Sequence, residues 1–231
     1  MHALLFARRK DRERKRLTSS SKLLRWSGLA AVLGGVLFSA KLLWEMADGG
    51  PLNATDVTDT LYFVVPLLWL AGLSGFCARC AERYGPLGIT GLMVSLGGLA
   101  LGTIGSLVGA WLEPLRLAYW LGFRFLCVGL VLLGVATIGA RALPRGWSVL
   151  PLVLGLLGLG RAFFMFFAVT MGATIFEAPE GQGGLGSFLG SWASTLTSAL
   201  GVLFGIGWGL LGYALWADKT EETARTTARV R

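Results

Sequence analysis

The sequence predicts an all-α fold, a polytopic transmembrane bundle of six helices with the N- and C-termini in the cytoplasm. Its composition is that of a membrane protein, with 54% apolar residues, 15% charged residues and a mean hydropathy of +0.65. Long apolar runs follow one another, and about 20 apolar residues suffice to cross a hydrocarbon core of about 30 Å. Because unpaired backbone polar groups cannot face lipid, we expect each run to be a helix.

The predicted transmembrane domain occupies residues 26–217, between a basic segment 1–25 and a C-terminal tail 218–231. We expect the spans at 26–47, 61–78, 87–112, 117–140, 147–176 and 188–217. The first span is longer than the apolar part of a signal peptide and lacks a small-x-small cleavage site, so we expect an uncleaved anchor. The fifth and sixth spans are long enough to tilt. The glycines that follow Gln182, which are Gly183, Gly184 and Gly186, predict a flexible connection between them.

Basic residues predict the orientation, because Lys and Arg near span ends resist translocation. Seventeen of the 21 Lys and Arg residues lie on one side of the predicted bundle, and nine of these are in segment 1–25. The connections on the other side hold acidic residues, with Arg116 as their only clear cation. We therefore expect a multi-pass protein of the cell membrane with both termini in the cytoplasm.

Most of the net charge of +8 lies in the first 25 residues, beside the first span. A basic segment at a membrane surface is attracted to anionic headgroups by about 1 kcal/mol per charge. We expect the lipid bilayer, and not nucleic acid, to be the partner of this segment. A contact with a protein or RNA is the alternative.

Tryptophan residues mark the same boundaries as the charges, because the indole ring prefers the headgroup level of a bilayer. Seven of them lie at predicted span ends, and these are Trp26, Trp44, Trp111, Trp120, Trp147, Trp192 and Trp216. The other two, Trp69 and Trp208, are expected to pack between helices.

Glycines on helix faces predict close helix packing, since small residues let two backbones approach. The glycines of the third span fall within about 60° of one another at 100° per residue, and these are Gly91, Gly98, Gly102, Gly105 and Gly109. A similar face of the sixth span carries Gly201, Gly205, Gly209 and Gly212. We expect these faces to pack against other helices, with the third helix at the centre of the bundle. A homo- or hetero-oligomer could form through them, and a ligand channel lined by glycines is the alternative.

Three cations within the predicted spans are candidate binding residues, because an ionisable group is costly inside a membrane. Arg161 is the deepest, about 21 Å from Trp147 at 1.5 Å per residue. It could bind an anionic group in a polar cavity. Hydroxyl side chains that could lie near it are those of Thr170, Ser194, Thr195, Thr197 and Ser198. Alternatively, it makes a structural hydrogen bond to a carbonyl or to a carboxylate of another span. Lys41 and Arg124 could both snorkel to the nearby interface, and Lys41 is also spaced to pair with Glu45.

The sequence lacks a complete set of catalytic residues. Gly72-Leu73-Ser74-Gly75 is similar to the G-x-S-G motif of the rhomboid intramembrane proteases. That family pairs its serine with a histidine on another helix, and the only histidine here is His2. Cys77 and Cys80 form a single C-x-x-C without the further ligands of a zinc or iron–sulfur site. We therefore expect no enzymatic activity, no metal and no cofactor.

Two functional hypotheses follow from these patterns. The first is a non-enzymatic subunit, sensor or assembly partner that packs through its glycine-rich helix faces. The second is a small transporter or channel for an anionic or polar solute with Arg161 in a polar cavity. Pro66 and Pro151 favour the second hypothesis, because interrupted helices often line transport sites.

Overall fold

The computed structural model describes residues 2–47, 55–80, 84–109, 116–140, 146–176 and 184–230. Six helices make up nearly all of this described part, so the all-α prediction is confirmed for it. They are α1 (His2–Ala47), α2 (Thr55–Cys80), α3 (Pro86–Gly109), α4 (Arg116–Ala140), α5 (Leu150–Phe176) and α6 (Gly184–Val230).

Among the described helices, five are long and apolar enough to cross a membrane. The apolar segments are Arg25–Ala47, Pro86–Val108, Leu117–Ala140, Leu150–Phe167 and Trp192–Ala217. In α2 the apolar segment is Phe63–Ala78, which is about 24 Å long at 1.5 Å per residue. The protein therefore crosses the membrane several times, and the crossing by α2 stays a prediction.

Helices α1 and α6 extend beyond the predicted spans. Residues 2–25 of the basic segment continue into the first span as one helix, and α6 runs through most of the tail to Val230. Lys, Arg, Glu and Ala are good helix formers, which accounts for both extensions. Two of the three glycines expected to form the connection before the sixth span, Gly184 and Gly186, lie in the first turn of α6 instead. Gln182 and Gly183 lie outside the described residues.

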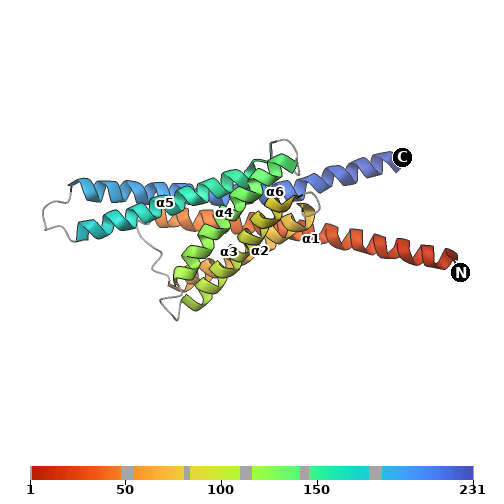
Figure 1. Ribbon diagram of the computed structural model, residues 1–231, viewed down its shortest axis with the longest axis horizontal. Helices are drawn as coiled ribbons and strands as arrows, with labels where there is room; N and C mark the ends of the chain where they lie inside the picture. The colour runs from red at the N-terminus through yellow and green to blue at the C-terminus, as the bar shows by residue number, and fades with distance from the viewer. Residues whose placement is uncertain are drawn as a thin grey trace.

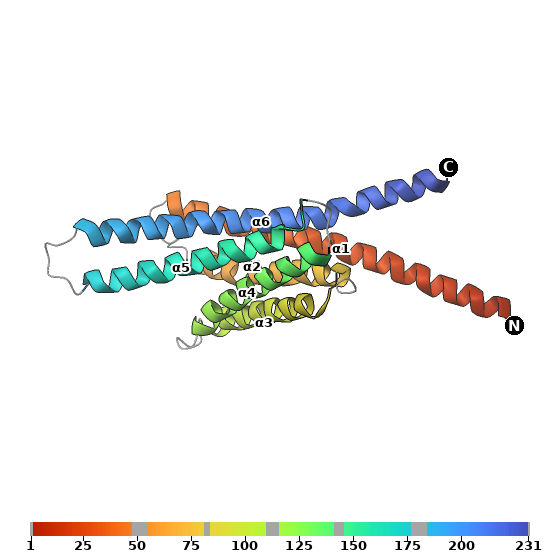
Figure 2. The ribbon, with the colours of Figure 1, turned by 45° about the horizontal axis from the view of Figure 1, so that its top comes forward.

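The helices form a ring in which each packs against its neighbours in the sequence, and α6 closes the ring along α1. Figure 1 and Figure 2 show both chain ends at the same end of the bundle, where α1 and α6 diverge. At the opposite end the α5–α6 hairpin extends beyond the other helices. Helix α3 packs mainly on α4 and only thinly on α2. It therefore lies at the edge of the bundle, and the expectation that α3 is central is wrong.

Aromatic side chains fill the centre of the ring. Trp69 of α2 stacks on Trp208 of α6, with ring centroids 5.3 Å apart and an interplanar angle of 11°. Phe204 meets Trp69 edge to face at 5.3 Å, and Phe38 of α1 meets Trp69 at 5.0 Å. The prediction that Trp69 and Trp208 pack between helices is confirmed. Such ring pairs add about 0.5–1.5 kcal/mol each beyond the area that they bury.

Glycines of α3 lie directly against the backbone of α4. A Cβ atom at Gly98 would lie 2.6 Å from the carbonyl oxygen of Gly122, and one at Gly91 would lie 2.6 Å from the amide nitrogen of Leu133. A Cβ atom at Gly105 would meet the backbone of Tyr119 as closely. Since a helix backbone cannot yield as a side chain can, these glycines set the distance between α3 and α4.

The other glycines of the two predicted faces are placed as follows. A Cβ atom at Gly102 would make only ordinary contacts with α4, at 3.9 Å or more. Gly109 ends α3 at the edge of the described residues. On α6, a Cβ atom at Gly205 would lie 2.8 Å from the carbonyl oxygen of Gly35, and one at Gly209 would have no heavy atom within 4 Å. In the other direction, a Cβ atom at Gly35 would lie 2.7 Å from the amide nitrogen of Gly209. The glycine face of α6 is thus occupied by α1 of the same chain.

A buried hydrogen bond joins the start of the α3 segment to the far end of α4. The Tyr84 and Thr137 hydroxyl oxygens lie 2.8 Å apart. Thr137 also donates to the Leu133 carbonyl within its own helix at 2.7 Å, so Tyr84 is the donor in the bond between the two segments. This polar contact lies at the end of the bundle where the chain termini are found.

Candidate functional site

A pocket of about 420 Å³ lies between α4 and α5. Its lining from α4 is Leu117, Trp120, Leu121, Phe123 and Arg124, and its lining from α5 is Arg161, Ala162, Met165 and Phe166. Its volume falls in the range of about 300–1,000 Å³ that is usual for small-molecule sites. Two of the three cations singled out from the sequence, Arg124 and Arg161, therefore line the same pocket.

The charge of the pocket lining is entirely positive. Among the described residues that line it, no acidic side chain accompanies Arg124 and Arg161. Arg124 is exposed, whereas Arg161 is partly buried. Two guanidinium groups without a carboxylate repel each other in a medium of low dielectric constant, and an anion between them would relieve that repulsion.

Arg161 is held by aromatic rings. Its guanidinium carbon lies 5.2 Å from the ring centroid of Phe38 on α1 and 5.5 Å from that of Phe123 on α4. Its Nε atom is buried and has no hydrogen-bond partner in the part of the chain that the structure describes. The structural alternative, a bond to a carbonyl or a carboxylate of another span, is therefore not what the described residues show. The cation–π contacts stabilise the charge and leave its N–H donors unused.

Gly201 of α6 makes the room that Arg161 occupies. A Cβ atom at Gly201 would lie 2.9 Å from Nε of Arg161 and would also collide with the Leu42 side chain. The absence of a side chain at this position lets the arginine pass between α5 and α6 toward α1. The glycine face of α6 thus leaves space for the Arg161 side chain at Gly201 and lets α1 approach closely at Gly205.

Both arginines lie well inside the apolar segments. Arg124 is seven residues from the start of Leu117–Ala140, and Arg161 is 11 residues from the start of Leu150–Phe167. These separations correspond to about 10 Å and about 17 Å along the helices. Arg124 lies in the first half of α4, away from the chain termini, whereas Arg161 lies near the middle of α5. At that depth an unpaired cation is costly and is by default a candidate functional group.

Lys41 is separate from this pocket. It is 5% exposed, and its Nζ atom lies 2.6 Å from Oε1 of Glu45, the pairing that the spacing predicts. The hydroxyl groups expected near Arg161 bond within their own helices, Thr170 to the Phe166 carbonyl and Thr197 to the Ala193 carbonyl. Of the charged and hydroxyl side chains that the sequence places near Arg161, the described lining of the pocket includes Arg124.

Sequence reasoning missed Phe38 and Phe123, the aromatic partners of Arg161. Phe38 comes from α1, far from α5 in the sequence, and Phe123 comes from the preceding helix α4. No periodic pattern distinguishes either residue from other apolar residues. Phe123 directly precedes Arg124, which is the one signal that could have drawn attention to it.

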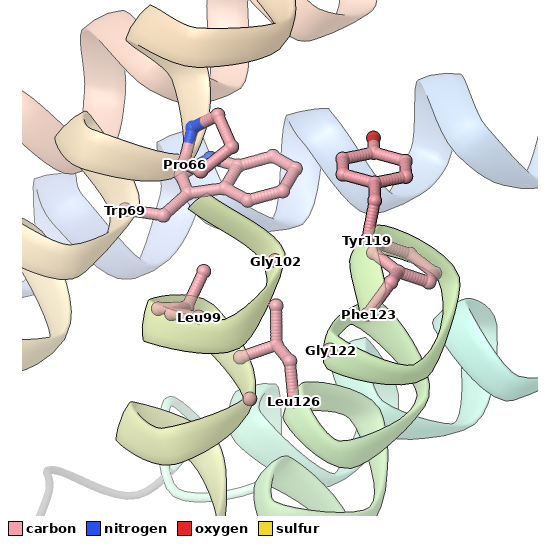
Figure 3. A pocket seen from close by; sticks show the side chains of 9 residues that line it. Pro66, Trp69, Leu99, Gly102, Tyr119, Gly122, Phe123 and Leu126 are labelled. Carbon is pink, nitrogen blue, oxygen red and sulfur yellow. The ribbon is translucent and has the colours of Figure 1, made fainter. Parts of the chain in front are cut away.

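A much smaller cavity of about 20 Å³ lies where α2 faces α3 and α4 (Figure 3). Pro66 and Trp69 contribute from α2, and Phe123 borders this cavity as well as the arginine pocket. The volume is enough for about one water molecule. The buried Nε1 atom of Trp69 has no hydrogen-bond partner among the described residues. The thin contact between α2 and α3 therefore leaves a small gap in the ring.

The residues considered for catalysis or metal binding are engaged locally. The Ser74 hydroxyl is exposed and donates to the Ala71 carbonyl at 2.8 Å. The Cys77 thiol donates to the Leu73 carbonyl at 2.7 Å, and the side chain of Cys80 lies outside the described part. Within the described part, no group of three or more His, Cys, Asp or Glu residues could hold a metal ion.

Comparisons with protein-family models, with curated proteins and with solved structures find no significant match to this chain. The chain is an integral membrane protein.

Proposed function

We propose that the protein binds an anionic ligand within the membrane, as the recognition step of sensing or transport, and without converting it chemically. The observation that carries this proposal is the meeting of Arg124 and Arg161 in one pocket whose described lining holds no acid. An oxyanion there would accept charge-assisted hydrogen bonds from both guanidinium groups, whose planar shape suits two-pronged contacts with phosphate or carboxylate.

The energetics of Arg161 support the same proposal. Placing an arginine at the centre of a membrane helix costs about 2.5–3.5 kcal/mol on insertion scales. Each cation–π contact returns about 0.5–2 kcal/mol, depending on how well the charge is desolvated. The two rings of Phe38 and Phe123 thus offset the cost of the charge. They do not use its N–H donors, and its Nε atom has no hydrogen-bond partner among the described residues.

The assembly hypothesis loses its main support. It rested on glycine faces that would be free to receive a partner. Gly91, Gly98 and Gly105 instead lie against α4, and Gly205 lies against α1. These glycines account for packing within one chain, so we place the ligand hypothesis first.

The test is ligand-induced stabilisation of the purified protein. A panel of anions, with phosphate esters and carboxylates in soluble and lipid forms, is screened for a shift in melting temperature. A ligand at about 100 times its Kd stabilises the folded state by about 2.7 kcal/mol. We expect at least one anion to stabilise the wild type and the control Arg25→Gln, an exposed arginine outside the pocket. The combined variant Arg124→Gln/Arg161→Gln should not respond. Equal responses in all three proteins, or none in the wild type, would contradict the proposal.

A further inference from the structure

Apart from its two arginines, the α4–α5 pocket is walled by apolar and aromatic side chains. A small hydrated anion that entered would lose its water against these walls and would regain donors from two guanidinium groups only. An anion that carries its own apolar portion fits better, since that portion would be buried against Leu121, Met165 and Phe166. The lining thus favours an amphiphile over a free ion.

The pocket is bordered by side chains that face the surroundings of the bundle. Leu117 is 66% exposed and Phe166 is 61% exposed, and both line the pocket. Phe163, one turn before Phe166 on α5, is also exposed. Apolar side chains that are exposed along a membrane-spanning segment face lipid chains, so the pocket opens sideways toward the bilayer. Figure 2 shows α4 and α5 as neighbours.

We infer that the ligand of this pocket is an anionic phospholipid, an inference that rests on the function proposed above. Its phosphate lies between Arg124 and Arg161, and its acyl chains follow the apolar groove beside Leu121 and Phe166. A phosphate offers several acceptor oxygens, enough for two-pronged contacts with both guanidinium groups. Trp120 lines the same pocket and suits the boundary between headgroup and chains, where indole rings are favoured.

The two arginines differ in burial, and we expect them to contact the lipid phosphate at different depths. Arg124 is exposed and reaches the pocket from its open side, whereas Arg161 lies deeper, between Phe38 and Phe123. Long basic side chains extend toward the interface, so Arg124 can meet a headgroup first and Arg161 can hold it further in. We also expect the basic segment 1–25 to attract anionic lipid. Its residues 2–25 are the N-terminal part of α1, which projects from the bundle (Figure 1), whereas Arg161 contacts Phe38 in the later part of α1. Lipid bound at the basic segment must be distinguished from lipid bound in the pocket.

The experiment measures lipid retention by native mass spectrometry of the full-length protein in detergent. The lipid probes are phosphatidylglycerol and phosphatidylcholine, and the soluble probes are inorganic phosphate and glycerol 3-phosphate. We expect the first phosphatidylglycerol to bind at least tenfold more tightly than phosphatidylcholine. Arg124→Gln/Arg161→Gln should abolish this preference, whereas the control Arg8→Gln/Arg9→Gln removes the same charge from segment 1–25 and should keep it. Should the arginine variant fold poorly, Ala162→Trp keeps both charges, fills the pocket and should weaken phosphatidylglycerol binding about tenfold.

The possible results distinguish a failure of the lipid inference from a failure of the proposed anion binding. Binding of a soluble phosphate that depends on both arginines, without a preference for phosphatidylglycerol, would overturn the lipid inference and leave the anion site standing. A phosphatidylglycerol preference that is lost in Arg8→Gln/Arg9→Gln and kept in Arg124→Gln/Arg161→Gln would also overturn it, because the lipid would then sit at the basic segment. If no anion of either kind depended on the arginines, both proposals would fall.

Discussion

The guanidinium carbon of Arg161 lies 5.5 Å from the ring centroid of Phe123, so a charge on α5 rests on an aromatic ring of α4. The same ring borders the arginine pocket on one side and the small cavity beside Trp69 on the other. Phe123 thus connects the aromatic centre of the bundle to the candidate site. Because the ring is neutral, it can hold the arginine without occupying its N–H donors.

Replacing Phe123 by Leu should weaken ligand binding. The change removes one of two cation–π contacts, each of about 0.5–2 kcal/mol, and lets Arg161 leave its position in the pocket. We expect a loss of affinity of about 2- to 30-fold, measured by titration with the tightest anion of the stabilisation screen. Phe125→Leu is the matched control, because Phe125 is exposed on the same helix and does not line the pocket. An equal loss in both variants would mean that the ring contact is irrelevant to binding.

Gly201→Ala should impair binding more than Gly209→Ala. A Cβ atom at position 201 collides with Leu42 and crowds Nε of Arg161, whereas one at position 209 has no heavy atom within 4 Å. Since flexible side chains can yield, we expect a small loss of stability for Gly201→Ala, about 1 kcal/mol, together with a clear loss of affinity. Gly209→Ala should keep wild-type binding. The idea that Gly201 makes room for the arginine is refuted if the two variants bind alike.

Gly98→Ala should destabilise the α3–α4 hairpin. The added methyl group would lie 2.6 Å from the Gly122 carbonyl oxygen and would also meet the amide nitrogen of Leu126. Overpacking against backbone costs about 1–3 kcal/mol, which should appear as a lower melting temperature in detergent. Its neighbour Gly97 is an internal control, because a Cβ atom there has no heavy atom within 4 Å. Gly97→Ala should melt at the wild-type temperature or above, since alanine is the better helix former.

Tyr84→Phe should lower stability without affecting the ligand. The variant loses the hydrogen bond to Thr137, while the Thr137 hydroxyl keeps its bond to the Leu133 carbonyl. The expected cost is about 0.5–1.5 kcal/mol, the usual net value of one hydrogen bond. Thermal unfolding followed by circular dichroism measures it, and anion titration of the same sample should show unchanged affinity. A loss of affinity would contradict this expectation, because neither Tyr84 nor Thr137 lines the pocket.

The sequence predicts features that are local along one helix. Apolar run length predicts the described helices and the five long spans, because lipid leaves a backbone no other way to satisfy its polar groups. The spacing of Lys41 and Glu45 predicts their ion pair, since residues four apart share a helix face. The burial of Trp69 and Trp208 follows from their position away from the span ends.

Features that depend on how helices meet were not predictable in the same way. The glycine stripe of α3 predicts a close contact, yet the partner turns out to be α4 alone, so that α3 lies at the edge of the ring. The sequence marks Arg161 as an unusual charge and predicts hydroxyl, carbonyl or carboxylate partners for it. The partners are the rings of Phe38 on α1 and Phe123 on α4, and these contacts depend on how α1, α4 and α5 pack together.

Thiol protection at position 162 tests whether Arg124 and Arg161 hold an anion between α4 and α5. Ala162 lines the pocket beside Arg161. Ala162→Cys is made in a protein that lacks Cys77, Cys80 and Cys127, and the rate of maleimide labelling is measured with and without phosphatidylglycerol. The account predicts that this lipid slows labelling several-fold, that phosphatidylcholine does not, and that Arg124→Gln/Arg161→Gln abolishes the protection. A labelling rate that the anionic lipid and the soluble phosphates leave unchanged in the arginine-containing protein would contradict it.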